Sequence, residues 1–419
     1  MRILKTKNLV LTIAILISTI QSFAQQWTIL PSGTTEHLKG VYFTSGEIGY
    51  VVGYHGTIKK TVDGGNNWIQ LNSGTTHNLN SVYFVSTSTG YAVGDTGTIL
   101  KTSNNGSNWS TIYSEDSMQL NSVYFLNASI GYAVGHSVTS IGGELGIVLK
   151  TANSGATWTK ISLDTIHSRF FDVHFKTELI GYICGAQANG IDFNSIVKKT
   201  SDGGNTWQNY YSGSPGLNVN CMSFIDSLKT FIGEGGIWET LNNGASWGIS
   251  GVGLSVISSS YFVSDSIGFF VGYGGGGVLK TINAGTYWAF DTSNTLAMLY
   301  HITFINDTGF IVGANGIILK RILSLPSTIK ENPFTIQSEI FPNPINENSF
   351  VKLTLSKSEF ISIKVTDELG RVVKQIPEKY FEKGENRIEM DCHNLIPGIY
   401  FLNLSSRNFS QTEKLIIAN

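Results

Sequence analysis

The chain has 419 residues, of which 41% are hydrophobic and 14% are charged, a balance that allows a packed core and excludes a disordered chain. The formal net charge is -2 at pH 7, so the chain lacks the basic surface that nucleic-acid binding needs, and we predict no nucleic-acid partner. Glycine is frequent, with 46 residues against 8 prolines, which favours an all-β chain with many tight turns.

The N-terminus predicts a secretory signal peptide over residues 1–24. A basic stretch that includes Arg2 and Lys7 precedes an apolar run at residues 9–20, and small residues around Ala24 follow. The apolar run is about 12 residues long, shorter than the roughly 20 that a membrane-spanning helix needs. We therefore expect no membrane span after the signal is removed.

Six copies of the segment Thr-x-(Asp or Asn)-x-Gly-x-x-Trp follow. Successive tryptophans are about 40 to 50 residues apart, the length of one four-stranded propeller blade. The acidic or amide residues of the six turns are Asp63, Asn104, Asn153, Asp202, Asn242 and Asn283. The tryptophans are Trp68, Trp109, Trp158, Trp207, Trp247 and Trp288.

Each residue type that recurs in these six turns has a structural reason. The side-chain oxygen of Asp63 or Asn104 can accept backbone N–H groups across the turn, and Gly65 or Gly106 can adopt a positive φ. The tryptophan then covers the hydrophobic layer. We therefore interpret these turns as structural rather than catalytic.

Between the turns, each unit repeats Leu-x-Ser-Val-Tyr-Phe, then Gly-Tyr-x-Val-Gly, then Ile-Leu-Lys-Thr, which predicts four short strands per unit. The seventh unit, residues 299–321, lacks the turn and its tryptophan, whereas residues 27–30 near the N-terminus resemble the strand after each tryptophan. We predict a seven-bladed β-propeller over residues 25–321, in which the N-terminal strand completes the last blade and removes the free sheet edges.

The repeat stops after Arg321. Residues 322–338 predict a linker, and residues 339–419 carry short strands with alternating apolar positions. This pattern predicts a second domain, a small Ig-like β-sandwich.

Both domains resemble known families. The turn motif resembles the Asp-box of bacterial neuraminidase repeats (BNR), and the longer pattern is similar to propellers of the photosystem II assembly factor type. This resemblance implies the fold and leaves the activity open, because such propellers include sialidases, other glycosidases and non-catalytic assembly proteins.

The C-terminal domain resembles the type A sorting domain of the type IX secretion system. The resemblance rests on the Pro-Asn-Pro start at residues 342–344, the turn from Asp367 to Arg371, and the final Lys-Leu-Ile-Ile run at residues 414–417. It implies that the secretion machinery is a partner of this domain, and that the protein is secreted or located at the outer cell surface.

One face of the propeller varies from blade to blade. The loop between the second and third strands is longer in unit three (residues 137–146) and unit four (residues 187–195), and the residue after Gly-Tyr-x-Val-Gly differs in almost every unit. These positions share the face opposite the Asp-box turns, where we predict the binding surface. The candidate ligand-binding residues are Tyr54, Asp95, His136, Arg169, Asp192, Phe193, Glu234 and Tyr273.

Three interpretations of this face remain open. The aromatic and hydrogen-bonding residues favour a non-catalytic module that binds an unknown surface protein or glycan. Alternatively, Asp95 and Glu234 would form the carboxylate pair of an exported glycoside hydrolase. The third interpretation is ordinary loop variation without a function.

The sequence argues against sialidase activity and against a metal site. A sialidase needs an arginine cluster to hold its substrate carboxylate, whereas the predicted propeller contains only Arg169 and Arg321. The histidines show no metal-ligand spacing. We predict no metal and no cofactor.

Overall fold

The computed structural model describes residues 26–138, 143–189, 192–226, 228–251, 253–274, 277–323, 336–345, 349–367, 371–390, 395–406 and 410–417. The chain divides into two compact units, residues 1–324 and 325–419. The predicted signal peptide and most of the predicted linker lie outside the described residues.

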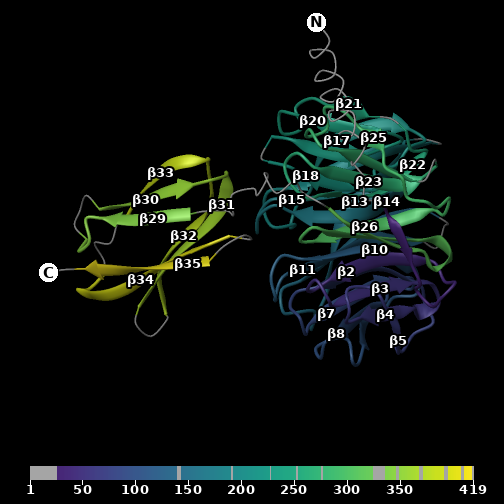
Figure 1. Cartoon of the computed structure of the whole chain (residues 1–419), viewed down its shortest axis with the longest axis horizontal. Helices are drawn as coiled ribbons and strands as arrows, with labels where there is room; N and C mark the ends of the chain where they lie inside the picture. The colour runs from purple at the N-terminus through teal and green to yellow at the C-terminus, as the bar shows by residue number, and fades with distance from the viewer. Residues whose placement is uncertain are drawn as a thin grey trace, which may run out of the picture. The chain divides into compact units, whose positions relative to one another are not determined.

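The described part of the first unit forms seven four-stranded antiparallel sheets, each of which is one blade of a β-propeller (Figure 1). This confirms the all-β fold class and the blade count predicted from the repeats. In blades one to six, each sheet consists of four strands that are consecutive in the sequence.

Blade one contains β2 (Leu38–Phe43), β3 (Gly49–Gly53), β4 (Ile58–Thr61) and β5 (Ile69–Leu71). Blade two contains β6 (Leu79–Phe84), β7 (Gly90–Gly94), β8 (Ile99–Thr102) and β9 (Ser110–Tyr113). Blade three contains β10 (Met118–Phe125), β11 (Gly131–Val138), β12 (Glu144–Thr151) and β13 (Thr159–Ile166). Blade four contains β14 (Ser168–Phe175), β15 (Gly181–Asn189), β16 (Asp192–Thr200) and β17 (Gln208–Pro215).

Blade five contains β18 (Met222–Phe224), β19 (Thr230–Gly233), β20 (Ile237–Thr240) and β21 (Gly248–Gly251). Blade six contains β22 (Val256–Phe262), β23 (Gly268–Tyr273), β24 (Val278–Thr281) and β25 (Ala289–Phe290). Blade seven contains β26 (Leu299–Ile305), β27 (Thr308–Gly313), β28 (Ile318–Ile322) and the N-terminal strand β1 (Thr28–Leu30). The 3-10 turns η1 (Tyr54–Gly56) and η2 (Ala314–Gly316) join the second and third strands of blades one and seven.

The N-terminal strand closes the ring as predicted. Strand β1 pairs with β28, with Thr28 opposite Lys320 and Leu30 opposite Ile318. Trp27 is fully buried and packs edge-to-face against Phe304, with ring centroids 6.2 Å apart. Trp27 thus takes the place of the tryptophan that blade seven lacks.

An ion pair replaces the missing Asp-box at this closure. Arg321 occupies the position that threonine holds in the other six blades, and only 6% of it is exposed. Its guanidinium pairs with the carboxylate of Asp291, which also accepts a hydrogen bond of 2.9 Å from the indole nitrogen of Trp27. Blade six, blade seven and the N-terminus are therefore joined at one carboxylate.

The Asp-box turns are held by their own side chains. In the first turn, Thr61 Oγ1 donates to Asp63 Oδ1 at 2.8 Å and accepts the Gly65 N–H at 2.8 Å, while Asp63 Oδ1 accepts the Asn67 N–H at 2.9 Å. Gly65 has φ 88°, which a residue with a side chain rarely adopts. Hydrogen bonds from Asn67 and Thr61 lower the pKa of Asp63 to about 2, so the turn keeps its acceptor charged at neutral pH.

Aromatic side chains connect each blade to the next. Tyr50 of β3 stacks on Phe84 of β6 with centroids 4.1 Å apart, and Phe84 meets Trp109 edge-to-face at 5.9 Å. Matching triads, with stacking distances of 4.0 Å in both cases, join blade two to three and blade three to four. Their members are Tyr91, Phe125 and Trp158, and Tyr132, Phe175 and Trp207.

The same contacts include hydrogen bonds to the next Asp-box turn. Tyr50 Oη and Lys60 Nζ both donate to the carbonyl oxygen of Asn105, at 2.9 and 2.8 Å. Tyr91 and Lys101 bind the Ser154 carbonyl in the same way, at 2.8 and 2.7 Å. A blade therefore holds the turn of its neighbour by packing and by two donors on one carbonyl oxygen.

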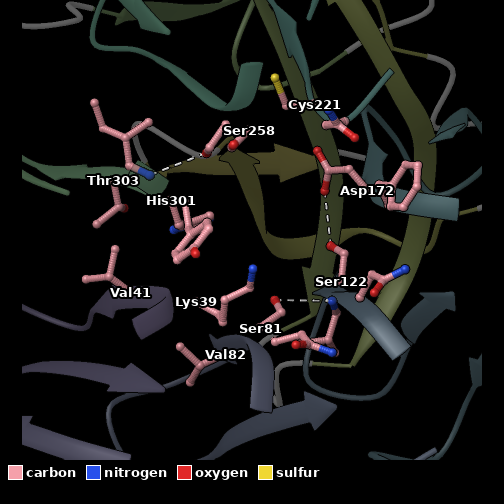
Figure 2. Close-up of a pocket in the computed structure, with 18 of the residues that line it drawn as sticks. Lys39, Val41, Ser81, Val82, Ser122, Asp172, Cys221, Ser258, His301 and Thr303 are labelled. Carbon is pink, nitrogen blue, oxygen red and sulfur yellow. Dashed lines mark hydrogen bonds between the residues drawn. The ribbon is translucent and has the colours of Figure 1, made fainter. Parts of the chain in front are cut away.

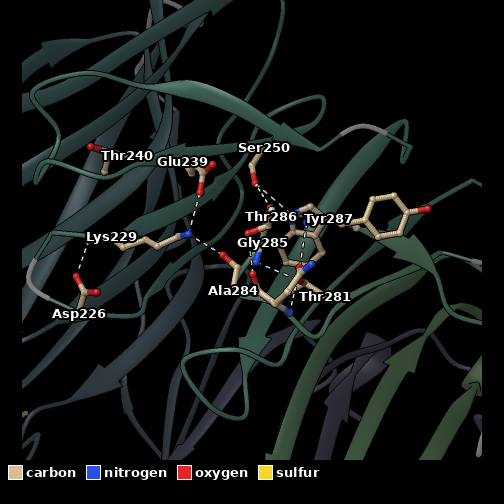
Figure 3. A network of polar contacts seen from close by, with 12 residues as sticks. Asp226, Lys229, Glu239, Thr240, Ser250, Thr281, Ala284, Gly285, Thr286 and Tyr287 are labelled. Carbon is tan, nitrogen blue, oxygen red and sulfur yellow. Dashed lines mark hydrogen bonds and ion pairs between the residues drawn. The ribbon is translucent and has the colours of Figure 1, made fainter. Parts of the chain in front are cut away.

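Blade five departs from this pattern. Its third strand carries Glu239 where the other blades carry lysine. Lys229, just before β19, donates instead to the carbonyl oxygen of Ala284 in the next turn at 2.6 Å, and lies 3.2 Å from the Glu239 carboxylate (Figure 3). The side chains of Lys229 and Glu239 are 19% and 22% exposed. Lys229 therefore neutralises Glu239, and it also supplies the hydrogen bond to the next turn that the third-strand lysine supplies in other blades.

The second unit contains two antiparallel sheets. One sheet contains β29 (Ile336–Phe341), β30 (Phe350–Leu355) and β33 (Gly384–Glu389), in that order. The other has the order β32 (Val372–Phe381), β31 (Glu359–Asp367), β34 (Gly398–Ser405) and β35 (Ser410–Ile417). Residues from both sheets, including Leu353 and Leu402, form one buried core, as in a β-sandwich.

The motifs that indicated a sorting domain contact one another in this unit. Asn343, between the two prolines, donates to the Lys414 carbonyl at 2.9 Å and accepts the Ile416 N–H at 3.0 Å. Asp367 accepts the backbone N–H and the Nε–H of Arg371, at 2.9 and 2.7 Å. The Pro-Asn-Pro start therefore holds the last strand in place.

We predict that Trp27→Ala destabilises the propeller by about 3 to 5 kcal/mol, because it deletes a buried aromatic side chain at the ring closure. Ile29→Ala is the matched control, since Ile29 lies only two residues after Trp27 but is 48% exposed, and we expect a change within about 0.5 kcal/mol. All tryptophans of the chain precede residue 289, so urea unfolding followed by tryptophan fluorescence reports on the propeller. Equal effects of the two substitutions would contradict the role of Trp27.

For blade five, we predict that Lys229→Met costs about 2 kcal/mol, because Glu239 loses its cation and the Ala284 carbonyl loses its donor. Adding Glu239→Lys returns a lysine to the position that it holds in the other blades. The double variant is therefore expected to regain most of the lost free energy of unfolding in the same assay. A double variant less stable than Lys229→Met would refute this compensation.

Candidate functional site

A cavity of about 550 Å³ lies between the inner strands of the propeller (Figure 2). All seven blades contribute to its lining, mostly through the repeated segment Leu-x-Ser-Val-Tyr-Phe or its equivalent. The end of the cavity near η1 is formed by residues at the end of the second strand of blades one, two and six, namely Tyr54, Asp95 and Tyr273. The Asp-box turns lie at the other end of the third strand, so this end belongs to the face predicted for binding.

An irregularity in strand register directs side chains toward the neighbouring blade. The pairing of β6 with β7 shifts between Leu79 and Ser81, and the other inner strands with a described register, except β18, shift at the same place. A bulge of this kind bends a strand and redirects a side chain. Asn80 stands at this position, and its Nδ2 donates to the Leu120 carbonyl of blade three at 2.9 Å.

Asn80 belongs to a belt of amides around the cavity. Asn121 donates to the Phe170 carbonyl at 2.7 Å, and Asn220 donates to the Ile257 carbonyl at 2.8 Å. Each bond joins one blade to the inner strand of the next. We call Asn80, Asn121 and Asn220 the amide belt, and it holds the wall of the cavity in a fixed geometry.

Asp95 is held in position at the mouth of the cavity. Its two carboxylate oxygens accept hydrogen bonds from Asn78 Nδ2 at 2.8 Å and from Asn80 Nδ2 at 3.2 Å. Its backbone N–H also donates to the Asn78 carbonyl at 3.0 Å. The carboxylate is therefore oriented before any ligand arrives.

A lysine lies among tyrosines next to Asp95. Lys39 Nζ is 3.7 Å from the ring centroid of Tyr300 and 5.9 Å from that of Tyr54. Tyr300 in turn contacts Tyr273 edge-to-face, with centroids 6.1 Å apart. Burial lowers the pKa of Lys39, and the charge of Asp95 partly opposes this effect.

Further inside, Asp172 and two histidines line the cavity. Asp172 accepts the Ser122 hydroxyl at 3.0 Å and lies 3.4 Å from His174 Nε2. Burial alone would raise the pKa of Asp172, but His174 and the hydrogen-bond donors together lower it. Burial lowers the pKa of His301 to about 4. Within the described residues, the shielded Nδ1 of His301 has no hydrogen-bond partner.

Tyrosines form a row around this part of the cavity. Tyr42 and Tyr83 are 5.1 Å apart between ring centroids, Tyr83 and Tyr124 are 5.5 Å apart, and Tyr124 and His174 are 5.6 Å apart. Burial, with the neighbouring Tyr261 and Tyr124, raises the pKa of Tyr42 to about 12. Tyr42 therefore stays a neutral phenol at physiological pH.

The structure places three of the predicted site residues in this cavity, namely Tyr54, Asp95 and Tyr273. The other five do not line it. Glu234 is 1% exposed and accepts a hydrogen bond from the hydroxyl of Tyr211. Asp95 and Glu234 thus do not meet as a pair in the cavity.

Four of these residues belong to the extended strands of blades three and four. Arg169 forms an ion pair with Glu144, and its guanidinium lies 5.1 Å from the ring centroid of Phe193. The charge of Glu144 also acts on His136. Burial lowers the pKa of His136, and the charge of Glu144 opposes this effect. Asp192 is exposed at the start of β16. The lengthened loops therefore continue the blades as strands with their own polar cluster.

Several residues of the cavity were not among the sequence candidates, although the repeat contains a signal for them. Asp172 and His301 stand where blades two and three have Ser81 and Ser122 in the segment Leu-x-Ser-Val-Tyr-Phe. Lys39 stands where those blades have the asparagines of the amide belt. The same comparison between repeats that found Asp95 would have found these three if it had been applied to the inner strand.

Comparisons with known proteins support both domains. Residues 339–418 match the family model for the secretion system C-terminal sorting domain, and residues 20–166 match the model for the photosynthesis system II assembly factor YCF48. No curated protein shows a significant match to this sequence.

Solved structures with the same fold include two YCF48 propellers. One is described as YCF48 bound to D1 peptide (20% identity, TM-score 0.56, covering 71% of this chain and 97% of that chain). The other is YCF48 from Cyanidioschyzon merolae (20% identity, TM-score 0.55, covering 71% and 98%). The WD40 β-propeller domain of Doa1 is similar at 12% identity, with a TM-score of 0.57 and coverage of 72% and 97%.

The sorting domain indicates where the protein acts. In the described part of the chain, no helix has the length and apolar character needed to cross a membrane. The protein carries a seven-bladed propeller similar to those of photosystem II assembly factors and a C-terminal secretion sorting domain, and it is secreted or located at the outer cell surface.

Proposed function

We propose that this secreted propeller is a non-catalytic binding module, and that a protein segment or a glycan enters the central cavity from the face that bears Tyr54, Asp95 and Tyr273. The observation that carries this proposal is the pre-formed polar lining of the cavity. The amide belt and the carboxylate of Asp95 are held by hydrogen bonds within the protein, so the ordering cost on binding is small.

The size and composition of the cavity are typical of a ligand site. Its volume of about 550 Å³ lies in the usual range for small-molecule and side-chain pockets. Tyr54, Tyr273 and Tyr300 provide aromatic faces near its mouth, and Asp95 provides an oriented acceptor. Such rings bind the apolar face of a sugar or the side chains of a peptide.

The carboxylates of the propeller argue against a glycosidase. A glycosidase needs a carboxylic acid with a raised pKa near a second carboxylate. Glu234 is buried against Tyr211, where a substrate in the cavity would not reach it. The pKa of Asp172 is lowered rather than raised, which is the wrong direction for a general acid at neutral pH.

A structural neighbour supports a peptide as one kind of ligand. The structure of YCF48 with D1 peptide documents peptide binding by a propeller of this fold. At 20% identity, this likeness concerns the fold, so the ligand of the present protein has to be found by experiment.

The test is binding of the full mature chain to an array of glycans and short peptides. We expect retention of at least one ligand without release of a cleaved product. The variant Tyr54→Ala/Tyr273→Ala should lose about tenfold in affinity for that ligand, because it removes two aromatic contacts at the mouth.

Tyr287→Ala is the matched control, because Tyr287 is 69% exposed in an Asp-box turn and does not line the cavity. It should bind like the unmodified protein. A cleaved glycan would show that the protein is an enzyme, and unchanged affinity of the double variant would show that the ligand binds elsewhere.

A further inference from the structure

We infer that the inner part of the cavity receives a positively charged side chain, lysine or arginine, of a partner protein. This inference rests on the proposed function and specifies the chemistry of the partner. It is carried by the carboxylate of Asp172, by Nδ1 of His301, which has no hydrogen-bond partner among the described residues, and by the tyrosine rings that line the same cavity. Figure 2 shows Asp172 with Ser122 on one wall of the cavity, and His301 on another.

The charges of the lining favour a cation. Among the described residues of the lining, Lys39 is positive, Asp95 and Asp172 are negative, and the rest are histidines or neutral residues. Lys39 and Asp95 lie near each other at the mouth, where the charge of Asp95 acts on Lys39. Asp172 lies further inside, beside Ser122 and His174. Among the described residues of the lining, the two aspartates outnumber the single lysine, and Asp172 has no lysine or arginine beside it.

The hydrogen-bonding groups favour a donor. His301 Nδ1 is shielded from water and unpaired within the described residues, so it can accept a hydrogen bond. The side-chain nitrogens of Asn121 and Asn220 each donate to a backbone carbonyl of the next blade, and the side-chain oxygens of the same amides can accept hydrogen bonds. An ammonium has three donors and a guanidinium has five, and neither has an acceptor. Such a group matches a lining that is rich in acceptors.

The aromatic rings favour the same group. Tyr42, Tyr83, Tyr124 and Tyr261 line the cavity, and the ring of Tyr124 lies 5.6 Å from that of His174. A cation is attracted to the face of such rings, and more strongly where water is excluded. The protein itself demonstrates this preference, because Lys39 Nζ lies 3.7 Å from the ring centroid of Tyr300 in the same cavity.

The experiment uses the full mature chain and four blocked peptides that differ in one central residue between glycines. The central residue is arginine, lysine, citrulline or glutamate. Citrulline has the shape of arginine without its charge. Affinities are measured by NMR titration at low salt, with the resonances of the peptide observed. We expect arginine or lysine to bind about tenfold more tightly than citrulline, and added salt to weaken this binding.

Asp172→Asn is the decisive variant, because it removes the charge and keeps the shape. It should reduce the affinity for the cationic peptide about tenfold and leave that for citrulline unchanged. Asp116→Asn is the matched control, since Asp116 is exposed and does not line the cavity, and it should change neither. If Asp172→Asn does not fold, the comparison of arginine with citrulline on the unmodified protein decides.

The outcomes separate this inference from the proposed function. Equal binding of arginine and citrulline, tighter binding of glutamate, or cation binding that is insensitive to Asp172→Asn would overturn the inference. If no peptide binds while a glycan binds and depends on Tyr54 and Tyr273, the inference fails and the binding module stands. If neither peptide nor glycan binds, both proposals fail.

Discussion

The contact between neighbouring blades is the interaction on which the structure depends. A tyrosine of one blade, such as Tyr50, stacks on a phenylalanine of the next, and its hydroxyl group reaches the turn that begins the last strand of that blade. Lys60, the residue before the last one of the third strand, donates to the same carbonyl oxygen. A single four-stranded sheet cannot bury its hydrophobic faces alone, so each blade depends on these contacts with its neighbours. Blade five keeps this hydrogen bond although its third strand has no lysine: Lys229, which precedes the second strand, donates to the equivalent carbonyl oxygen of Ala284 in the next turn.

The cavity is a consequence of the same repetition. Seven inner strands surround one axis, and the amide belt ties three of them to their neighbours. Because the backbone geometry repeats, a residue can differ in one blade without disturbing the others. Asp172 and His301 are differences of this kind, placed where blades two, three and six have serine. The scaffold supplies rigidity, and the exceptions to the repeat supply the chemistry of the site.

The two units of the chain divide the functions between them. In the sorting domain, the residues of the recognised motifs contact one another, and Asn343 is hydrogen-bonded to the last strand. The propeller carries the surface that would meet a partner outside the cell. Export is thus assigned to the second unit, and the proposed recognition to the first.

The repeat in the sequence determined the propeller, its seven blades and the closure by Trp27, because short-range patterns of apolar residues, glycine and tryptophan specify strands and turns locally. The tail motifs likewise determined the sorting domain. Only the tertiary structure decided the site. It brought Tyr54, Asp95 and Tyr273 to one cavity, left Glu234 buried against Tyr211, and added Lys39, Asp172 and His301. The reason is geometric: contacts across the ring join residues that lie far apart in the chain, and the repeat by itself does not say which of its varied positions face the common cavity.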